Sequence, residues 1–494
     1  MNENFYYRKM DHCDIESLKV LDTIRDLVLY VADTFGEKKA LCSKTEDLTY
    51  AQLKEHTFRI ASFLSAKLEK GTCIAVLCDP SVAWMEAFLG ITSGGMTAVL
   101  IPPAMPPEVI CELMRITNTK GVIYGKEYVG NVELINKSVQ LEICIALEQV
   151  CREEGQKVEM VAEIDPDSMA ALFFTTGTTG ANKCVPLSHK VIMRNAYNGM
   201  LGMPSHKEDV CLAILPFFHV FGLIRSVLTF LYEGGTVYLT ENMKTFIADL
   251  QWAKPTTLVL VPSLAESLCG LASKKGSEVL GGRLRTIITG GSAMKPKTKV
   301  EFLRYGIEML QGYGLTEASM IAGNTDTDKH LDSVGKPYPG TEVMILDGEI
   351  LIKGDNVFKG YFNPKDNEMV FENGWYHTGD LGYIDEDGYL YLVGRKKFVI
   401  ITENGENISP EELEKRIDAI EGVEESLIYE AKTDRGKAIL AVDIYAPGLS
   451  QKDCEDKVLE LNRELPESHR VYSIHKVEEP LPRNAGKKII RKRV

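Results

Sequence analysis

The strongest constraint on the fold is an alternation of helical and strand-like segments between about residue 20 and residue 390. Apolar residues recur at the helical period in stretches such as 23–35, "TIRDLVLYVADTF". Short apolar runs of strand length, such as "CIAVLC" at 73–78 and "LRTIITG" at 284–290, lie between these stretches. Chains that alternate in this way place helices on the faces of a mostly parallel sheet. The sequence therefore predicts a layered α/β fold.

The pattern changes after about residue 340 to short strands separated by Gly and Asp turns. Residues 385–388 read "DEDG", a combination typical of tight turns. We expect residues 333–395 to form the β-rich end of a large N-terminal domain that spans residues 1–395.

The last hundred residues, 396–494, predict a separate small α+β domain, with the boundary near 395–398. One helix start is well marked. Ser409 is a candidate N-cap, Pro410 occupies the first helical position, and Glu412 would close a capping box. The helix would then present an apolar stripe made of Leu413, Ile417 and Ile420.

Charge and apolar patterning exclude two classes of protein. The 494 residues carry a formal net charge of −14, whereas nucleic-acid binding requires clustered positive charge. The longest apolar stretch, 211–224, contains Pro216 and His219 and is shorter than the ~20 residues needed to span a bilayer. We therefore expect neither nucleic-acid binding nor a transmembrane segment.

The cysteines and the N-terminal segment indicate where the protein acts. The 11 Cys include no CxxC pair, so neither a disulfide framework nor a zinc site is indicated. Residues 1–16 are polar and lack the apolar core of a secretory signal. A reducing, cytoplasmic location is the expectation.

Residues 175–183, "TTGTTGANK", are a candidate phosphate-binding loop. Its glycines allow backbone amides to converge on an anion, the Thr hydroxyls add donors, and Lys183 adds positive charge. The GxxGxxK spacing differs from that of a Walker loop. Taken alone, the stretch fits a structural turn between strands equally well.

Two further motifs carry polar residues suited to nucleotide chemistry. In "QGYGLTEAS" at 311–319, Tyr313 offers an aromatic face, while Thr316 and Glu317 could bind phosphate and a divalent cation. Farther along, Asp380 suits a diol and Arg395 a phosphate. A tight turn with a solvated Glu, and a structural Asp, are the alternatives.

Together and in this order, these motifs resemble those of the adenylate-forming superfamily, which includes acyl-CoA synthetases and peptide-synthetase adenylation domains. The resemblance extends over nearly the whole chain, and it implies a large N-terminal domain with a small, mobile C-terminal domain. The further matching stretches are 215–222, 289–296, 333–343, 348–363, 394–414 and 481–491.

The resemblance also implies a role for individual residues. Those that would bind the β- and γ-phosphates of ATP are Thr175, Thr176, Gly177, Thr178, Thr179, Gly180 and Lys183. Mg²⁺ would lie near Thr175 and Glu317. The rest of the nucleotide would contact Gly291, Ser292, Gln311, Gly312, Tyr313, Gly314, Thr316, Asp380 and Arg395. His219 would border the carboxylate substrate, with a packed core histidine as the alternative, and Lys397 falls on the hinge.

The catalytic lysine of the superfamily has two possible positions in "PRNAGKKIIR", residues 482–491. Alignment without a gap places it at Lys488, whereas matching the local "GK" favours Lys487. We prefer Lys488, because the following "KIIR" then also matches. A solvated basic tail is the alternative.

The implied activity is that of an ATP-dependent acid–thiol ligase, which uses Mg²⁺ and transfers an acyl group to CoA. The apolar surroundings of His219 favour an acid without a positive charge, and we expect a medium- or long-chain fatty acid. One departure from the family is Asn182-Lys183-Cys184, where Pro-Lys-Gly is usual, so the loop exit is expected to be less rigid. The alternatives are a ligase that loads an acyl carrier protein and a weakly catalytic nucleotide-binding protein.

Overall fold

A computed structural model describes residues 19–152, 163–176, 182–202, 207–240, 242–324, 330–401, 407–433, 438–483 and 489–491. The chain divides into two compact units, which are described separately below. The first consists of Met1–Glu342 with Ile352–Tyr376, and the second of Val343–Leu351 with His377–Val494.

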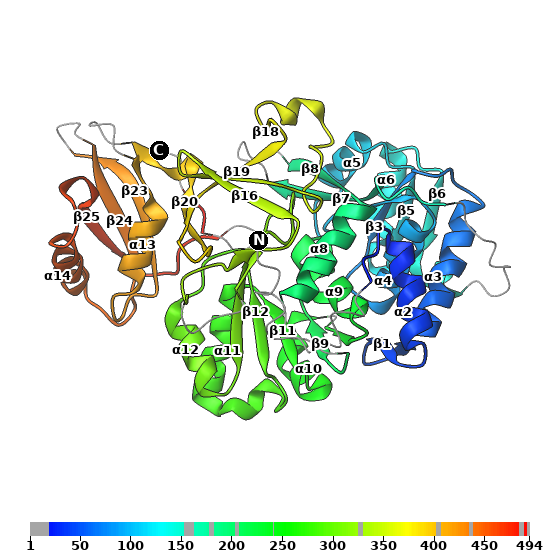
Figure 1. The fold of residues 1–494 in the computed structure, drawn as a ribbon, viewed down its shortest axis with the longest axis horizontal. Coiled ribbons are helices and arrows are strands. Elements are labelled where there is room, and N and C mark those ends of the chain that lie inside the picture. Colours follow the sequence, from blue (N-terminus) through cyan, green and yellow to red (C-terminus); the bar gives the residue numbers. More distant parts are fainter. Residues whose placement is uncertain are drawn as a thin grey trace. The chain divides into compact units, whose positions relative to one another are not determined.

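The first unit contains a six-stranded sheet in which the candidate phosphate loop leaves a parallel strand. The strands are parallel except for β8, which forms an antiparallel hairpin with β7 (Figure 1). In sheet order they are β6 (Ile143–Ala146), β5 (Gly121–Tyr124), β3 (Cys73–Leu77), β4 (Thr97–Val99), β7 (Met169–Thr176) and β8 (Asn182–Ser188).

A nine-stranded sheet forms the other half of the first unit. Six neighbouring strands, from β13 to β1, run parallel, and the strands at both edges are antiparallel to their neighbours. In sheet order the strands are β15 (Lys336–Pro337), β14 (Ala322–Gly323), β13 (Glu308–Tyr313), β12 (Thr286–Thr289), β11 (Thr257–Leu260), β9 (Val210–Ala213), β10 (Thr236–Leu239), β1 (Lys39–Cys42) and β2 (Asp47–Thr49).

Some helices of the first unit begin at a side chain that caps them, and the helices bury apolar residues. Thr23 caps α2 and Thr49 caps α3, each in a full capping box. The helices are α2 (Ile24–Phe35), α3 (Tyr50–Ser65), α4 (Val82–Ser93), α5 (Pro107–Ile116), α6 (Val129–Ser138), α7 (Leu147–Arg152), α8 (His189–Leu201), the π-helix η3 (Phe221–Leu228), α9 (Thr229–Tyr232), α10 (Phe246–Ala253), α11 (Pro262–Lys275) and α12 (Pro296–Arg304). Short 3₁₀ turns occur at η2 (Lys126–Tyr128), η4 (Met243–Thr245) and η5 (Ser277–Leu280).

Strands dominate the chain between residues 336 and 395, as predicted. A five-stranded sheet has the order β16-β17-β19-β18, and β20 pairs with β19. The division into units falls within β16, β17 and β19. The elements are β16 (Thr341–Leu346), β17 (Glu349–Gly354), η6 (Pro364–Asn367), β18 (Phe371–Glu372), β19 (Trp375–Ile384) and β20 (Leu390–Arg395).

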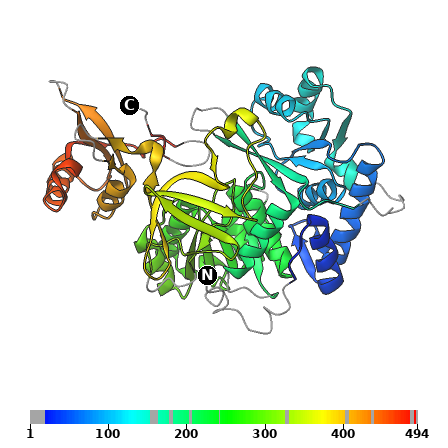
Figure 2. The same ribbon diagram turned by 45° about the horizontal axis from the view of Figure 1, so that its top comes forward.

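The C-terminal part of the second unit has the predicted α+β composition. Leu440, Val442 and Ile444 alternate along β24 and share a core with both helices, which lie against the three-stranded sheet (Figure 2). The elements are η7 (Lys396–Phe398), β21 (Ile400–Ile401), β22 (Asn407–Ile408), α13 (Pro410–Asp418), β23 (Glu425–Lys432), β24 (Ala438–Tyr445), α14 (Gln451–Asn462), η8 (Glu467–His469) and β25 (Val471–Val477).

The α/β fold class is confirmed, but one local prediction is wrong. Ser409 does precede α13, and Pro410 is the first helical residue. The capping box with Glu412 is absent, however, because the Ser409 hydroxyl donates to the carbonyl oxygen of Val393 at 2.9 Å instead. Residues 395–398, where we expect the domain boundary, lie inside the second unit, and that boundary stays a prediction.

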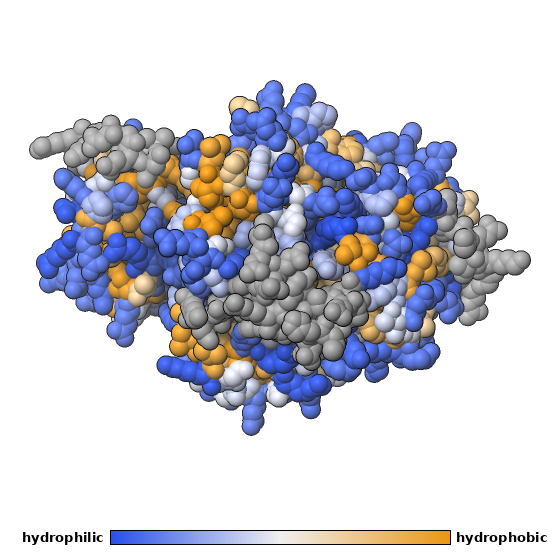
Figure 3. All heavy atoms as spheres, in the orientation of Figure 1, coloured by the Kyte–Doolittle hydropathy of each residue, from blue (hydrophilic) through white to orange (hydrophobic). Residues whose placement is uncertain are grey.

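Most large apolar side chains are buried in the cores of the two units. The face drawn in Figure 3 is covered mainly by hydrophilic residues, with hydrophobic residues in scattered groups. Within the described ranges, no helix is both long and apolar enough to cross a membrane. The apolar stretch at 211–224 instead forms β9 and the start of the π-helix, and most of its residues are buried.

His189, at the start of α8, makes the stability of the first unit dependent on pH. Its Nδ1 accepts a hydrogen bond from the Ile24 N–H at 3.3 Å, and burial lowers its pKa to about 4, helped by the charge of Arg25. Because the unfolded chain takes up this proton near the ordinary His pKa of 6.5, stability falls as the pH drops from there towards 4.

We expect this proton to cost the native state up to about 3 kcal/mol at the acid end of that range. The measurement is urea unfolding at pH 7 and pH 5 for the wild-type chain and for His189→Asn, which keeps an acceptor but does not titrate. The variant is expected to lose less stability between the two pH values. An equal loss in both proteins would contradict the role of His189.

Candidate active site

Three of the predicted motifs meet at one edge of the nine-stranded sheet. The loops that contain them follow the carboxyl ends of β9, β12 and β13, and in parallel strands these ends lie at the same edge, where α/β proteins bind ligands. Gly290 shows how closely they approach. A Cβ atom there would lie 3.3 Å from the ring of Phe221 and 3.4 Å from the carbonyl oxygen of Gly312, so the bare backbone allows the three loops to pack together.

The loop after β12 presents Gly291 and Ser292 to solvent. Gly291 has a φ of +85°, which favours glycine. Gln311 and Tyr313 are buried in β13, and the carbonyl oxygen of Gln311 accepts the Asn324 N–H at 2.9 Å. Gly312, Gly314 and Thr316 are half-buried beside them. The structure thus brings these predicted residues together, and adenine binding stays a prediction.

His219 is exposed at the end of the segment that connects β9 to the π-helix, so it is not a packed core histidine. Its ring lies edge-on to Phe218, with centroids 4.8 Å apart. The π-helix that follows buries Arg225 to 2% exposure. Arg225 directly follows the apolar stretch 211–224 and was not among the predicted site residues; π-helical turns are frequent at functional sites.

Glu317 is held by a tyrosine that sequence reasoning missed. The Tyr361 hydroxyl donates to Glu317 Oε1 at 2.6 Å, and the Phe358 N–H donates to the Glu317 carbonyl oxygen at 2.8 Å. The Tyr376 hydroxyl lies 3.3 Å from that of Tyr361. Burial, followed by the charge of Glu317, raises the pKa of both phenols, so both remain protonated at neutral pH.

The same tyrosine contacts the strand that leaves the phosphate loop. Lys183 Nζ lies 4.4 Å from the centroid of the Tyr361 ring, and Lys183 pairs with Thr175 across the β7–β8 hairpin. The loop residues Gly177, Thr178, Thr179 and Gly180, and the side chain of Thr176, lie outside the described residues. Tyr361 therefore links the loop exit to the candidate metal ligand.

Cys184, one of the departures from the family pattern, continues β8 without interruption. It is buried and pairs with Phe174, and burial raises the pKa of its thiol to about 12. It is thus an inert packing residue at neutral pH.

Two buried amides fix the segment that follows Glu317. Asn195 Oδ1 accepts the Met320 N–H at 2.7 Å, and Asn195 Nδ2 donates to the Asn356 carbonyl oxygen at 2.9 Å. Asn356 Nδ2 donates to the Met320 carbonyl oxygen at 2.8 Å. Because these residues are far apart in the sequence, no local pattern could have predicted the network.

In the second unit, Asp380 and Arg395 form an ion pair. They are register partners on β19 and β20, with Arg395 Nε 2.5 Å from Asp380 Oδ1. The Asp380 N–H donates to Thr378 Oγ1 at 3.0 Å, and the Thr378 hydroxyl donates to the Ile350 carbonyl oxygen at 2.6 Å. The carboxylate is thus firmly oriented, and its contact with ribose stays a prediction.

Glu349 organises the residues around this pair. It accepts hydrogen bonds from Lys396 Nζ at 2.7 Å and from the Gly379 N–H at 3.1 Å, and it lies 3.2 Å from His377 Nδ1. Burial favours a raised pKa for Glu349, but the bonds from Lys396 and His377 outweigh it and lower the pKa. Lys397, the predicted hinge residue, lies in the adjacent turn with its Nζ 4.7 Å from the Phe398 ring.

The remaining candidates concern the metal and the tail. In the parts of the chain that the structure describes, no group of three or more His, Cys, Asp or Glu residues could hold a metal ion. One carboxylate nevertheless suits Mg²⁺, which takes most of its ligands from phosphates and water. Lys487 and Lys488 lie outside the described residues.

Comparison with known proteins supports the resemblance to the adenylate-forming superfamily. The AMP-binding enzyme family matches residues 30–362. A 2-succinylbenzoate–CoA ligase from Bacillus cereus is 26% identical over 489 residues, covering 96% of this chain and 98% of the relative. A long-chain-fatty-acid–CoA ligase from Bacillus subtilis is 25% identical over 533 residues, covering 96% and 94%.

Among solved structures, the O-succinylbenzoate coenzyme A synthetase from Bacillus subtilis, in complex with ATP and magnesium ion, aligns with a TM-score of 0.81. It is 26% identical, and the alignment covers 94% of this chain and 98% of that chain. The overall fold is therefore shared with an enzyme of known structure.

Tyr361→Phe tests the link between the tyrosine and the metal site. It removes the hydroxyl that orients Glu317 but keeps the ring beside Lys183. We expect the Mg²⁺ concentration for half-maximal ATP binding to rise on the order of tenfold, the scale of losing an outer hydrogen bond to a metal ligand. Titration calorimetry at several Mg²⁺ concentrations measures this shift.

Tyr376→Phe is the matched control, because the Tyr376 hydroxyl contacts that of Tyr361. A smaller shift is expected for this variant. An unchanged Mg²⁺ requirement in Tyr361→Phe would argue against Glu317 as a metal ligand.

Proposed function

The chain belongs to the AMP-binding enzyme family, and we propose that it is an acid–CoA ligase. It activates a carboxylic acid with ATP to give an acyl-adenylate and pyrophosphate. The thiol of CoA then attacks the activated carbonyl carbon and displaces AMP, which leaves a thioester.

The contact of Tyr361 with both Lys183 and Glu317 carries this proposal. A carboxylate is a poor electrophile, and its activation on the α-phosphate builds negative charge there and on the departing pyrophosphate. Lys183 at the loop exit and a cation held by Glu317 would stabilise that charge. A single buried tyrosine positions both groups, so they are preorganised before the substrate arrives.

The relatives support the choice of cofactors. The solved relative is in complex with ATP and magnesium ion, and the sequence relatives reported above are named as CoA ligases. In this chain Thr175 and Glu317 would lie near Mg²⁺, which lends positive charge to the phosphates. These names favour CoA over an acyl carrier protein as acceptor, and they favour a ligase over a merely nucleotide-binding protein.

The acid is proposed only as a class, a carboxylic acid without an ammonium group. The relatives named above act on either 2-succinylbenzoate or long-chain fatty acids. The names of the relatives favour 2-succinylbenzoate over the fatty acid that we expected from the sequence. The nine cysteines among the described residues are all free, in keeping with a reducing cytoplasm.

The first test is the identity of the products. Purified protein with ATP, Mg²⁺, CoA and an acid is expected to release AMP and pyrophosphate in equal amounts. The acids to compare are 2-succinylbenzoate and a series of fatty acids of increasing length, each with and without CoA. Release of ADP and phosphate in stoichiometric amounts would rule out adenylation. If acyl transfer occurred only with an acyl carrier protein, that protein and not CoA would be the acceptor.

The second test decides between the paired lysines. We expect Lys488→Ala to lower the adenylation rate ~10²-fold or more, the scale of losing one preorganised charged donor, and Lys487→Ala to have little effect. Thioester formation from pre-made acyl-adenylate is expected to survive both changes. A large adenylation loss only in Lys487→Ala would reverse the assignment.

A further inference from the structure

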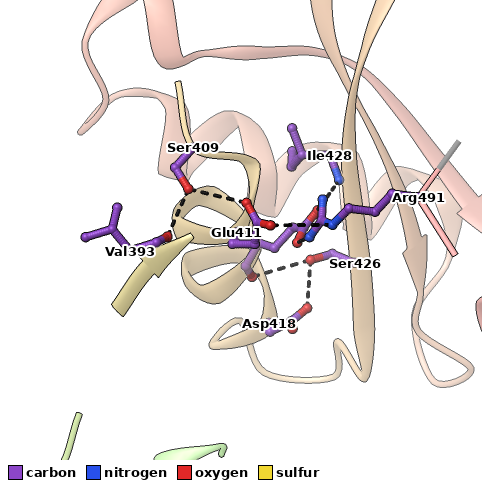
Figure 4. Close-up of polar contacts among 8 residues, drawn as sticks. Val393, Ser409, Glu411, Asp418, Ser426, Ile428 and Arg491 are labelled. Carbon is purple, nitrogen blue, oxygen red and sulfur yellow. Dashed lines mark hydrogen bonds and ion pairs between the residues drawn. The ribbon is translucent and has the colours of Figure 1, made fainter. Parts of the chain in front are cut away.

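The last described residue, Arg491, forms a bidentate ion pair with Glu414 of helix α13. Its Nη1 donates to Glu414 Oε1 at 2.9 Å, and its Nη2 donates to Glu414 Oε2. Its Nε lies 3.7 Å from Glu411 Oε1, and its guanidinium carbon lies 5.1 Å from the centroid of the Phe398 ring. Figure 4 shows the arginine reaching from the tail to the helix.

This ion pair is too buried to be an incidental surface contact. The side chains of Arg491 and Glu414 are only 16% and 10% exposed, and exposed ion pairs, by contrast, contribute little. Burial favours a lower pKa for Arg491, but the hydrogen bonds and charge of Glu414 raise it. Burial raises the pKa of the Glu414 carboxyl. Removing either partner would leave a costly unpaired charge.

Glu414 is itself fixed by the body of the second unit. Its Oε1 also accepts the Ile428 N–H of β23 at 2.7 Å, so one carboxylate joins a helix, a strand and the tail. All of these residues belong to the second unit. The contact would therefore persist if that unit moved as a body.

The residues on the two sides of 484–488 are bonded to each other, and those before residue 484 are also bonded to β23. Arg483 forms an antiparallel bridge with Ile489, and the Ile490 N–H donates to the Pro482 carbonyl oxygen at 2.8 Å. Glu425 of β23 accepts bonds from Arg483 Nη2 at 2.5 Å and from the Leu481 N–H at 2.9 Å. Residues 481–483 and 489–490 are thus held by these bonds.

We infer that Arg491 is a positioning residue for adenylation: it acts as a clamp that fixes the chain directly after Lys487 and Lys488, the two candidates for the catalytic lysine. This inference rests on the proposed function. A lysine on a chain fixed at only one end would lose conformational freedom each time it reached the phosphate. Fixing the other end removes that loss in advance, a benefit on the order of 10- to 100-fold in rate.

Arg491→Met tests the clamp, because it keeps most of the aliphatic part of the side chain and removes the charged guanidinium group. We expect the kcat of adenylation to fall on the order of 10- to 100-fold, with little change in the KM for ATP. Thioester formation from pre-made acyl-adenylate is expected to stay within about twofold. Arg491→Lys, which keeps the charge but not the guanidinium group, is expected to recover part of the rate.

Arg416→Met is the matched control. Arg416 lies on the same helix and pairs with Glu464 at 2.8 Å, but it is well exposed, so both half-reactions are expected to remain normal. Thermal unfolding of each variant reports any general loss of stability.

A second comparison separates positioning from a merely structural role. Arg491→Met is combined with Lys488→Ala or Lys487→Ala, whichever of the two lowers adenylation on its own. In this double variant Arg491→Met is expected to cause no further loss of adenylation, since no lysine remains to be positioned. A further loss there, an equal loss in both half-reactions, or an unchanged adenylation rate in Arg491→Met alone would overturn the clamp. Absence of acid-dependent pyrophosphate release by the wild-type chain would overturn the proposed function and the clamp with it.

Discussion

The candidate site depends on the burial of one carboxylate. Glu317 is 8% exposed, and a carboxylate removed from water is stable only where hydrogen bonds or cations compensate for the lost hydration. Tyr361 supplies one strong donor. The remaining capacity of the carboxylate suits a hard cation, and Tyr361 connects this carboxylate with Lys183 of the β7–β8 hairpin.

The fold could be predicted to a large extent because it rests on patterns that are local in the sequence. Helical periodicity and short apolar runs depend on neighbouring residues, and they predicted the α/β layers, the β-rich stretch before residue 395 and the C-terminal α+β region. The capping box at Ser409 was wrong because the Ser409 hydroxyl donates to Val393, 16 positions earlier in the chain, and the local sequence does not show that the two residues meet.

The site could be predicted only in its principal residues. Motif spacing identified Lys183, Glu317 and Asp380, but not what holds each of them. Tyr361 lies in the matching stretch 348–363, yet nothing in the spacing of that stretch shows that the Tyr361 hydroxyl faces a carboxylate 44 positions earlier in the chain. Contacts of this kind follow from sheet order, in which strands distant in the sequence become neighbours.

The frame behind Glu317 is built from amides. Asn195 and Asn356 hold the Met320 backbone through groups that neither gain nor lose protons in the physiological range. A frame of carboxylates and lysines would tighten or loosen as its charges changed with acidity or with salt. Because Asn195 and Asn356 are uncharged, a change of charge next to the Glu317 carboxylate leaves their hydrogen bonds to the Met320 backbone intact.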